Sequence, residues 1–404
     1  MAYTRGLVVL WGGEFAARVA ESLFQIALLW YLLEVTGSSA VTGLVTMVSY
    51  LPAIVVGLWA GVLVDRWPLP AVLLGAEGVR TALALALPLL FLAGALPVWA
   101  VGLLAFLLNG AAAFFNPARD ALIPRLAGPG GLVAANSLVQ SAWQFSLLLG
   151  PFLAAVALQW VPTAHLFFGV ALAFALSGAV LLPLPALARA APQTPAGPAL
   201  PFGAALRAGL AALLRDRRVF WLWVVTLVNN FFLMGPVIVG MPVYVREHLG
   251  ASGSVFAVVE GTYAGGMIVA TWVVSRYGER RDPVRMLFWA LIYDGLTYVP
   301  LLWVTGVPGT LATVLVHAFG IPAITIFRLT ALHRMVPREV QGRVFAAFHL
   351  AVAGMMALSI GTTGAVLAWL PVNRLFAVIG LLCAATGVAG HLLPAFRERP
   401  GGTG

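Results

Sequence analysis

The stretch LVVLWGGEFAARVAESLFQIALLWYLL, residues 7–33, decides the fold class of this chain. At about 1.5 Å per residue, a helix of this length crosses a hydrocarbon core roughly 30 Å thick. Three charged residues, Glu14, Arg18 and Glu21, interrupt the apolar run. A charge near the centre of a bilayer costs at least about 2.5 to 3.5 kcal/mol. The stretch therefore predicts a membrane span with one face that avoids lipid.

The composition extends this prediction to the whole chain. Of 404 residues, 61% are hydrophobic and 9% are charged, and the mean hydropathy of +0.99 lies far outside the range of soluble domains. The predicted spans are residues 7–33, 40–64, 70–93, 97–116, 132–158, 163–184, 219–245, 253–275, 284–304, 309–331, 342–369 and 372–394. The predicted fold class is an all-α polytopic membrane protein.

The basic residues and the short motifs exclude several functions. All 23 basic residues are arginine. A phosphate-binding loop and Schiff-base catalysis both need lysine, so an ATP-driven pump within this chain and lysine covalent chemistry are excluded. The chain contains no His-Glu-x-x-His, Gly-x-Ser-x-Gly or Cys-x-x-Cys motif, and its single Cys383 rules out an intramolecular disulfide. We therefore expect no enzyme activity, no cofactor and no metal.

The distribution of arginine predicts the topology. With the N-terminus in the cytoplasm, most arginines fall in cytoplasmic segments, while Arg246 and Arg374 fall outside and Arg18, Arg80 and Arg328 fall within spans. This is the positive-inside bias of membrane proteins. We expect a multi-pass protein of a bacterial-type inner (plasma) membrane with both termini cytoplasmic. The net charge of +9 is spread over short loops, so we expect no nucleic-acid partner.

A long polar interval divides the chain. It runs from Pro183 to Arg218, is rich in proline and alanine, and separates six predicted spans from six. A weak repeat supports this division, because WYLLEVTGSS from Trp30 aligns with VYVREHLGAS from Val243. Two such halves are typical of transporters that work by alternating access. The predicted parts are an N-terminal six-helix half at 1–184, a cytoplasmic linker at 185–218 and a C-terminal six-helix half at 219–404.

Two loops in corresponding places of the two halves carry glycine and charged residues. The first is GVLVDRWPLPAVLL, from Gly61, with Asp65 and Arg66. It resembles the signature loop between the second and third spans of the major facilitator superfamily, in which Asp65 and Arg66 match the acidic and basic positions. VVSRYGERRDPVRM, from Val273, occupies the equivalent place in the second half and keeps Arg276.

Further motifs point to the drug:proton antiporter branch of this superfamily. GAEGVRTAL, with Glu77 and Arg80, resembles the acid-x-x-Arg pattern that begins the third span. SLLLGPFLAA, from Ser146, is similar to the Gly-Pro antiporter motif of the fifth span, with Gly150 and Pro151. NPARDALIPRLAGPGGLVAANSL and HRMVPREVQGRVFAAF resemble the loops after the fourth and tenth spans of macrolide-efflux and enterobactin exporters. The resemblance implies twelve helices in two pseudo-symmetric halves.

The resemblance also implies gating residues at a cytoplasmic charge cluster. We expect Asp65 and Arg66 to join Glu77 and Arg80 there. The complete set of expected gating residues is Gly61, Asp65, Arg66, Glu77, Arg80, Gly150, Pro151 and Arg276.

The superfamily fold implies that spans 1, 4, 7 and 10 line a central cavity, and charge placement in span 1 agrees. Glu14, Arg18, Glu21 and Gln25 follow spacings of 4, 3 and 4, which places them on one helical face. Because one arginine cannot fully compensate two carboxylates, we expect one of them to hold a proton part of the time. The alternative is an internal ladder that only holds helices together.

Other polar residues within spans are weaker candidates for binding substrate or protons. A solitary His or Asn in a helix bundle is more often an interhelical hydrogen bond. Asp294, in the ninth span, has no assigned role. The additional candidates are Asn109, Asn230, Glu260, Tyr263 and His317.

Together these patterns predict a secondary active transporter that exports amphiphilic or drug-like small molecules by proton-coupled alternating access. A lipid or lysolipid flippase of the same fold is an alternative. A proton channel or a non-transporting membrane sensor is an alternative of another class. The expected partners are an amphiphilic small molecule, protons and membrane lipid, and we expect a monomer.

Overall fold

The computed structural model describes residues 4–57, 60, 64, 67–127, 132–189, 202–278 and 281–397. Within these residues the chain is helical and has no β-strand. Its internal contacts divide it into two units, Met1–Ala199 and Leu200–Gly404. The boundary lies inside the predicted linker, and the described part of that linker contains helices.

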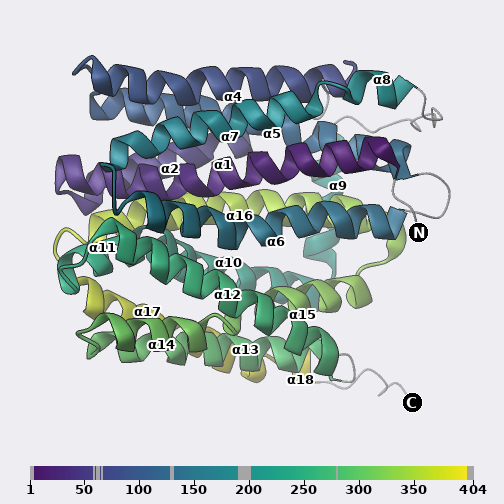
Figure 1. Ribbon diagram of the computed structural model, residues 1–404. Helices are drawn as coiled ribbons and strands as arrows, with labels where there is room; N and C mark the ends of the chain where they lie inside the picture. The colour runs from purple at the N-terminus through teal and green to yellow at the C-terminus, as the bar shows by residue number, and fades with distance from the viewer. Residues whose placement is uncertain are drawn as a thin grey trace. The chain divides into compact units, whose positions relative to one another are not determined.

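The first unit is built on its N-terminal helix. α1 begins after Thr4, whose hydroxyl accepts a hydrogen bond from the Leu7 amide, and ends at Gly37, whose φ of 60° suits a helix C-terminus. α1 packs against α6 and α7, and α4 packs against α5 and α7 (Figure 1). The elements are α1 (Arg5–Thr36), α2 (Ser39–Val55), α4 (Leu69–Leu92), α5 (Val98–Ala127), α6 (Leu132–Ala157), η1 (Thr163–His165), α7 (Leu166–Leu181) and α8 (Leu184–Arg189).

The second unit has longer composite helices. Its first long segment continues from α10 through two π-helical turns as far as His248. The elements are α9 (Phe202–Arg215), α10 (Arg217–Gly235), η2 (Pro236–Gly240), α11 (Met241–Val243), η3 (Tyr244–His248), α12 (Gly253–Tyr277), α13 (Pro283–Tyr298), η4 (Val299–Leu302), α14 (Val307–His317), α15 (Gly320–Met335), α16 (Arg338–Val366), α17 (Val372–Leu392) and α18 (Pro394–Arg397).

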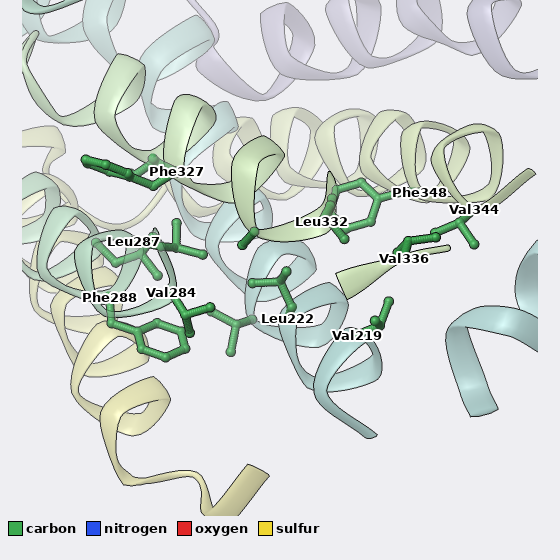
Figure 2. Packing of buried hydrophobic residues seen from close by; sticks show 14 of the residues in the cluster. Val219, Leu222, Val284, Leu287, Phe288, Phe327, Leu332, Val336, Val344 and Phe348 are labelled. Carbon is green, nitrogen blue, oxygen red and sulfur yellow. The ribbon is translucent and has the colours of Figure 1, made fainter. Parts of the chain in front are cut away.

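Large side chains fill the interior at one end of this second unit. Figure 2 shows Leu222 of α10, Leu287 and Phe288 of α13, Phe327 of α15 and Phe348 of α16, which belong to one buried cluster. All five are buried. Because lipid is as apolar as these side chains, close packing between the helices, rather than escape from water, is what stabilises such a cluster.

The all-α polytopic fold is confirmed. Ten helical segments among the described residues are long and apolar enough to cross a membrane. α2, of 17 residues, and α13, of 16, coincide with the other two predicted spans but are shorter. The count of twelve spans therefore stays a prediction.

The first part of each of two loops predicted from the sequence is instead helical. α5 continues eleven residues beyond position 116, to Ala127, although it contains Pro117 and Pro124. α15 likewise continues to Met335. Hydropathy marks where a helix leaves the apolar layer, not where the helix ends. In the polar part of α5, Arg119 and Asp120 form ion pairs. As a result, Arg119 lies on the same helix as the apolar residues before it.

Candidate functional site

Seven charged side chains of α1, α4 and α5 form one continuous chain of ion pairs. Acids and arginines alternate along it, with four carboxylates and three guanidinium groups. With every group ionised, the set therefore carries one net negative charge. We refer to it as the ion-pair chain. Its order is Asp120, Arg119, Glu14, Arg18, Glu21, Arg80 and Glu77.

Glu14 joins α1 to α5 in this chain. Arg18 Nε and Arg119 Nη1 both donate to Glu14 Oε1, at 2.7 and 2.5 Å. Arg119 Nη2 lies 2.8 Å from Asp120 Oδ1. Asn116 Oδ1 accepts hydrogen bonds from Arg18 Nη2 at 2.8 Å and from Arg119 Nη1 at 3.3 Å. Asn116 and Asp120 therefore position the two arginines, and the two arginines hold the buried Glu14.

Glu21 joins α1 to α4. Arg18 Nη1 donates to Glu21 Oε2 at 2.6 Å, and Arg80 Nη2 donates to Glu21 Oε1. Arg80 Nη1 also donates to Glu77 Oε1 at 2.8 Å. The guanidinium group of Arg80 lies 4.2 Å from the ring centroid of Phe174, which adds a cation–π contact. Both Arg80 and Glu77 are fully buried, so this end of the chain is shielded from water.

The structure corrects the predicted charge balance of span 1. The expectation of one arginine opposite two carboxylates is wrong, because Arg119 and Arg80 each add a second cation to one glutamate. Both arginines come from other helices and reach Glu14 and Glu21 with their long side chains. Sequence reasoning missed Arg119 because it placed that residue in a loop. The signal that could have found it is the spacing of Asn116, Arg119 and Asp120, which share one face if the helix continues.

The expected gating residues lie in different places. Gly61, Asp65 and Arg66 fall outside the described residues. Glu77 and Arg80 are buried within the first unit and pair with each other and with Glu21.

The remaining gating candidates are on α6 and α12. Gly150 lies against Ser22 of α1 and leaves no room for a Cβ atom there. Pro151 follows it within α6. Arg276 is exposed in the last turn of α12, and its guanidinium group lies 5.8 Å from the ring centroid of Tyr277.

One end of the ion-pair chain lines a cavity of about 700 Å³. This volume is typical of sites for drug-sized molecules. Its wall comes from α1, α5 and α6, and combines carboxylates and arginines with neutral amide and hydroxyl groups. Trp11 Nε1 donates to Ser141 Oγ at 3.1 Å next to it. The polar lining residues are Glu14, Arg18, Arg119, Asp120, Asn136, Ser137, Gln140, Ser141 and Gln144.

Three other predicted site residues lie outside this cavity. Gln25 Oε1 accepts a hydrogen bond from the Tyr50 hydroxyl at 3.4 Å. Asn109 Nδ2 and Asn230 Nδ2 donate to backbone carbonyls one turn earlier in their own helices, at 3.0 and 2.9 Å. These two asparagines thus make intrahelical bonds, rather than the interhelical bonds expected of polar residues in spans.

The second unit brings together three separate candidates from the sequence, Glu260, Tyr263 and His317, and adds Asp294. The Tyr263 and His317 rings are stacked with centroids 5.9 Å apart. His317 Nε2 lies 3.7 Å from Asp294 Oδ1. Both Asp294 and His317 are buried, at 0% and 3% exposure. Glu260 and Tyr263 are three residues apart on α12, but no sequence spacing links them with Asp294 of α13 or His317 of α14.

A second cavity of about 700 Å³ is apolar and is lined by α4 and α5. Leu83, Phe106 and Phe114 contribute to its wall. At its edge the rings of Trp67 and Phe114 are stacked with centroids 6.3 Å apart.

Comparison with known families decides the class of the molecule. Residues 10–362 match the family described as the Major Facilitator Superfamily. The chain belongs to the major facilitator superfamily. This multi-pass membrane protein is therefore a transporter rather than an enzyme, in line with the resemblance of its motifs.

Relatives within the superfamily are distant but span the full length. The chain is 22% identical to macrolide efflux protein A of Streptococcus pyogenes, over 96% of each chain. It is 24% identical to the multidrug efflux pump Tap of Mycolicibacterium fortuitum, over 97% of this chain and 96% of that protein.

Solved structures share the fold. A POT family transporter in complex with 5-aminolevulinic acid matches with a TM-score of 0.77 and 14% identity, over 96% of both chains. The nucleoside transporter NupG matches with a TM-score of 0.74 and 11% identity, over 98% of this chain and all of that one. At such identity these matches concern the fold alone.

Proposed function

We propose that this transporter exports amphiphilic or drug-like small molecules in exchange for protons, by alternating access. It would act in a bacterial-type inner membrane with both termini in the cytoplasm. One observation carries the proposal: a drug-sized cavity whose wall includes part of the ion-pair chain, which has one carboxylate more than it has arginines. The names of the two full-length relatives, a macrolide efflux protein and a multidrug efflux pump, support the same class of substrate.

The excess carboxylate is the group that can couple substrate binding to proton binding. A single uncompensated negative charge in a site of reduced dielectric is neutralised either by a proton or by a cationic substrate. The two then compete for one charge, so that binding of either weakens binding of the other. Asp120 is the most accessible member of the chain, with 62% of its side chain exposed, and is the group that a cation in the cavity would meet first.

Glutamine variants of the chain test this coupling. Glu14→Gln and Glu21→Gln each leave three acids and three arginines, and every arginine keeps one of its present carboxylate partners. We therefore expect both variants to fold but to lose the proton release that a cationic amphiphile causes in the detergent-solubilised wild type. Glu34→Gln is the matched control, because Glu34 is an exposed carboxylate of α1 outside the ion-pair chain.

The transport assay uses proteoliposomes and a fluorescent cationic amphiphile, with and without a pH gradient. We expect gradient-driven transport by the wild type and by Glu34→Gln, and none by Glu14→Gln or Glu21→Gln. If the wild type moves the dye equally well without a gradient, proton coupling is wrong. If the two glutamine variants release protons like the wild type, the ion-pair chain is only structural.

A second candidate function, movement of a lipid or lysolipid, is favoured by the apolar cavity on α4 and α5. The apolar side chains that line this cavity can make the same van der Waals contacts with an acyl chain as lipid tails make in the bilayer. A labelled lysolipid in the same proteoliposomes separates the two functions, because a flippase would transfer it between leaflets without a pH gradient and an exporter of drug-like cations would not.

A further inference from the structure

Asp294 and His317 form a buried pair in the second unit, which the coupling scheme above does not use. Neither carboxylate oxygen of Asp294 nor Nε2 of His317 has a hydrogen-bond partner among the described residues. Within the same part of the chain, the nearest basic nitrogen to the carboxylate is His317 Nε2, at 3.7 Å. Burying a carboxylate without donors or a cation is costly, and such groups within a membrane are associated with function.

The surroundings of His317 determine which of its ring nitrogens carries a proton. Thr297 Oγ1 lies within hydrogen-bond distance of the carbonyl oxygens of Tyr293 and Asp294, at 3.0 and 2.9 Å, and its single proton goes to one of them. With its proton on a carbonyl, Thr297 Oγ1 is free to accept a hydrogen bond from His317 Nδ1, which lies 2.9 Å away. A neutral imidazole protonated at Nδ1 has its free electron pair at Nε2. This nitrogen faces Asp294, so the pair can take up one proton between them.

Packing holds the pair in this position. The rings of Tyr298 and His317 lie with centroids 3.9 Å apart, and Tyr263 stacks on the same imidazole. The Asp294 side chain lies directly against Gly320 of α15, where a Cβ atom would not fit. Residues of four helices, α12 to α15, therefore fix the positions of the Asp294 and His317 side chains.

A small cavity lies between Glu260 and His317, the member of the pair that lines it. Glu260, Tyr263 and His317 line it together with Tyr298 and with apolar residues of η2, α11, α12 and α14, and it has about 10 Å³ of space for the centre of a water molecule. That is room for about one water. The Tyr263 hydroxyl has no partner among the described residues, so a water there would find several polar partners. Glu260 is half-buried and makes no ion pair within the described chain.

We propose that Glu260, His317 and Asp294 form a second proton-binding site, within the second unit, in which the proton passes between Glu260 and the His317–Asp294 pair through a water in this cavity. The step moves one proton: the donor carboxyl group becomes a carboxylate, and the imidazole Nε2 or the Asp294 carboxylate gains the proton. The use of this site in transport rests on the proposed proton-coupled function.

Other titratable groups near Asp294 cannot replace His317 in this role. Tyr263 of α12, Tyr293 and Tyr298 of α13, and Cys383 of α17 interact electrostatically with Asp294. None of them becomes a cation, so His317 is the group that can stabilise an ionised Asp294.

The test measures proton binding by the purified full chain in detergent, separately from transport. Infrared difference spectra between acid and alkaline pH detect the carbonyl band of a protonated carboxyl group. We expect Asp294→Asn to remove such a band, His317→Gln to shift its titration, and Glu260→Gln to remove a second band. Glu247→Gln, which alters an exposed carboxylate of the same unit, serves as the control and should leave these bands unchanged.

The same variants are then assayed for gradient-driven export. We expect all three to lose it while retaining exchange of substrate across the membrane without a gradient. If Asp294→Asn does not fold, His317→Gln and Glu260→Gln carry the test. Unchanged bands together with normal gradient-driven export would overturn this site and leave the proposed function intact. Gradient-independent transport by the wild type would refute the proposed function, while the spectra would still decide whether the second site binds protons.

Discussion

At the scale of single residues, Arg80 is the side chain on which the ion-pair chain depends most. It is buried, it is the partner of Glu77, and it also pairs with Glu21. Without Arg80, an ionised Glu77 would have no cation beside it in the interior. Removing one partner of a buried pair costs far more than the pair contributes, because the other charge remains desolvated.

Arg80→Ala should therefore destabilise the fold by about 3 to 5 kcal/mol. The measurement is thermal or denaturant unfolding in detergent. Arg374→Ala, at an exposed arginine that makes no ion pair with the described residues, should change stability by less than about 0.5 kcal/mol. The double change Glu77→Gln with Arg80→Gln removes both charges and should recover part of the loss. Equal stabilities of Arg80→Ala and the wild type would mean that Glu77 is neutral without its partner.

At the scale of elements, small residues set how closely helices approach. Gly150 of α6 lies against Ser22 of α1, and a Cβ atom at this position would collide with the serine side chain. Both helices contribute to the wall of the polar cavity, since Glu14 lies on α1 and Gln140 on α6. The spacing of α1 and α6 therefore determines the shape of that cavity.

Gly150→Ala should thus destabilise the protein by about 1 to 3 kcal/mol, the usual cost of overpacking, and should lower the affinity for substrate. Gly169→Ala is the matched control, because Gly169 of α7 has open space around the position of a Cβ atom. That change should be neutral or slightly stabilising, since alanine favours a helix by about 1 kcal/mol over glycine. Unfolding and ligand-binding measurements on the two variants check this, and similar losses in both would refute the role of the contact.

At the scale of the whole molecule, the arginine distribution predicts on which side each loop lies. Ser252 precedes α12 in a segment predicted to be outside, and residue 193 lies in the predicted cytoplasmic linker. The single native cysteine, Cys383, is fully buried, so cysteines introduced at these positions can be labelled on an otherwise unreactive background. We expect an impermeant thiol reagent applied to intact cells to label Ser252→Cys but not Gln193→Cys. The opposite pattern would overturn the predicted orientation.

The sequence alone determined the membrane class, the all-α fold and the face of α1 that carries Glu14, Arg18 and Glu21. Hydropathy and helical periodicity are local properties, so they can be read from neighbouring residues. Only the tertiary structure showed that Arg80 and Arg119 complete the ion-pair chain, and that Asp294 lies beside His317. These contacts join residues 23 to 105 positions apart on different helices. Which long side chains meet there depends on how the helices pack against each other, and no local pattern in the chain encodes that.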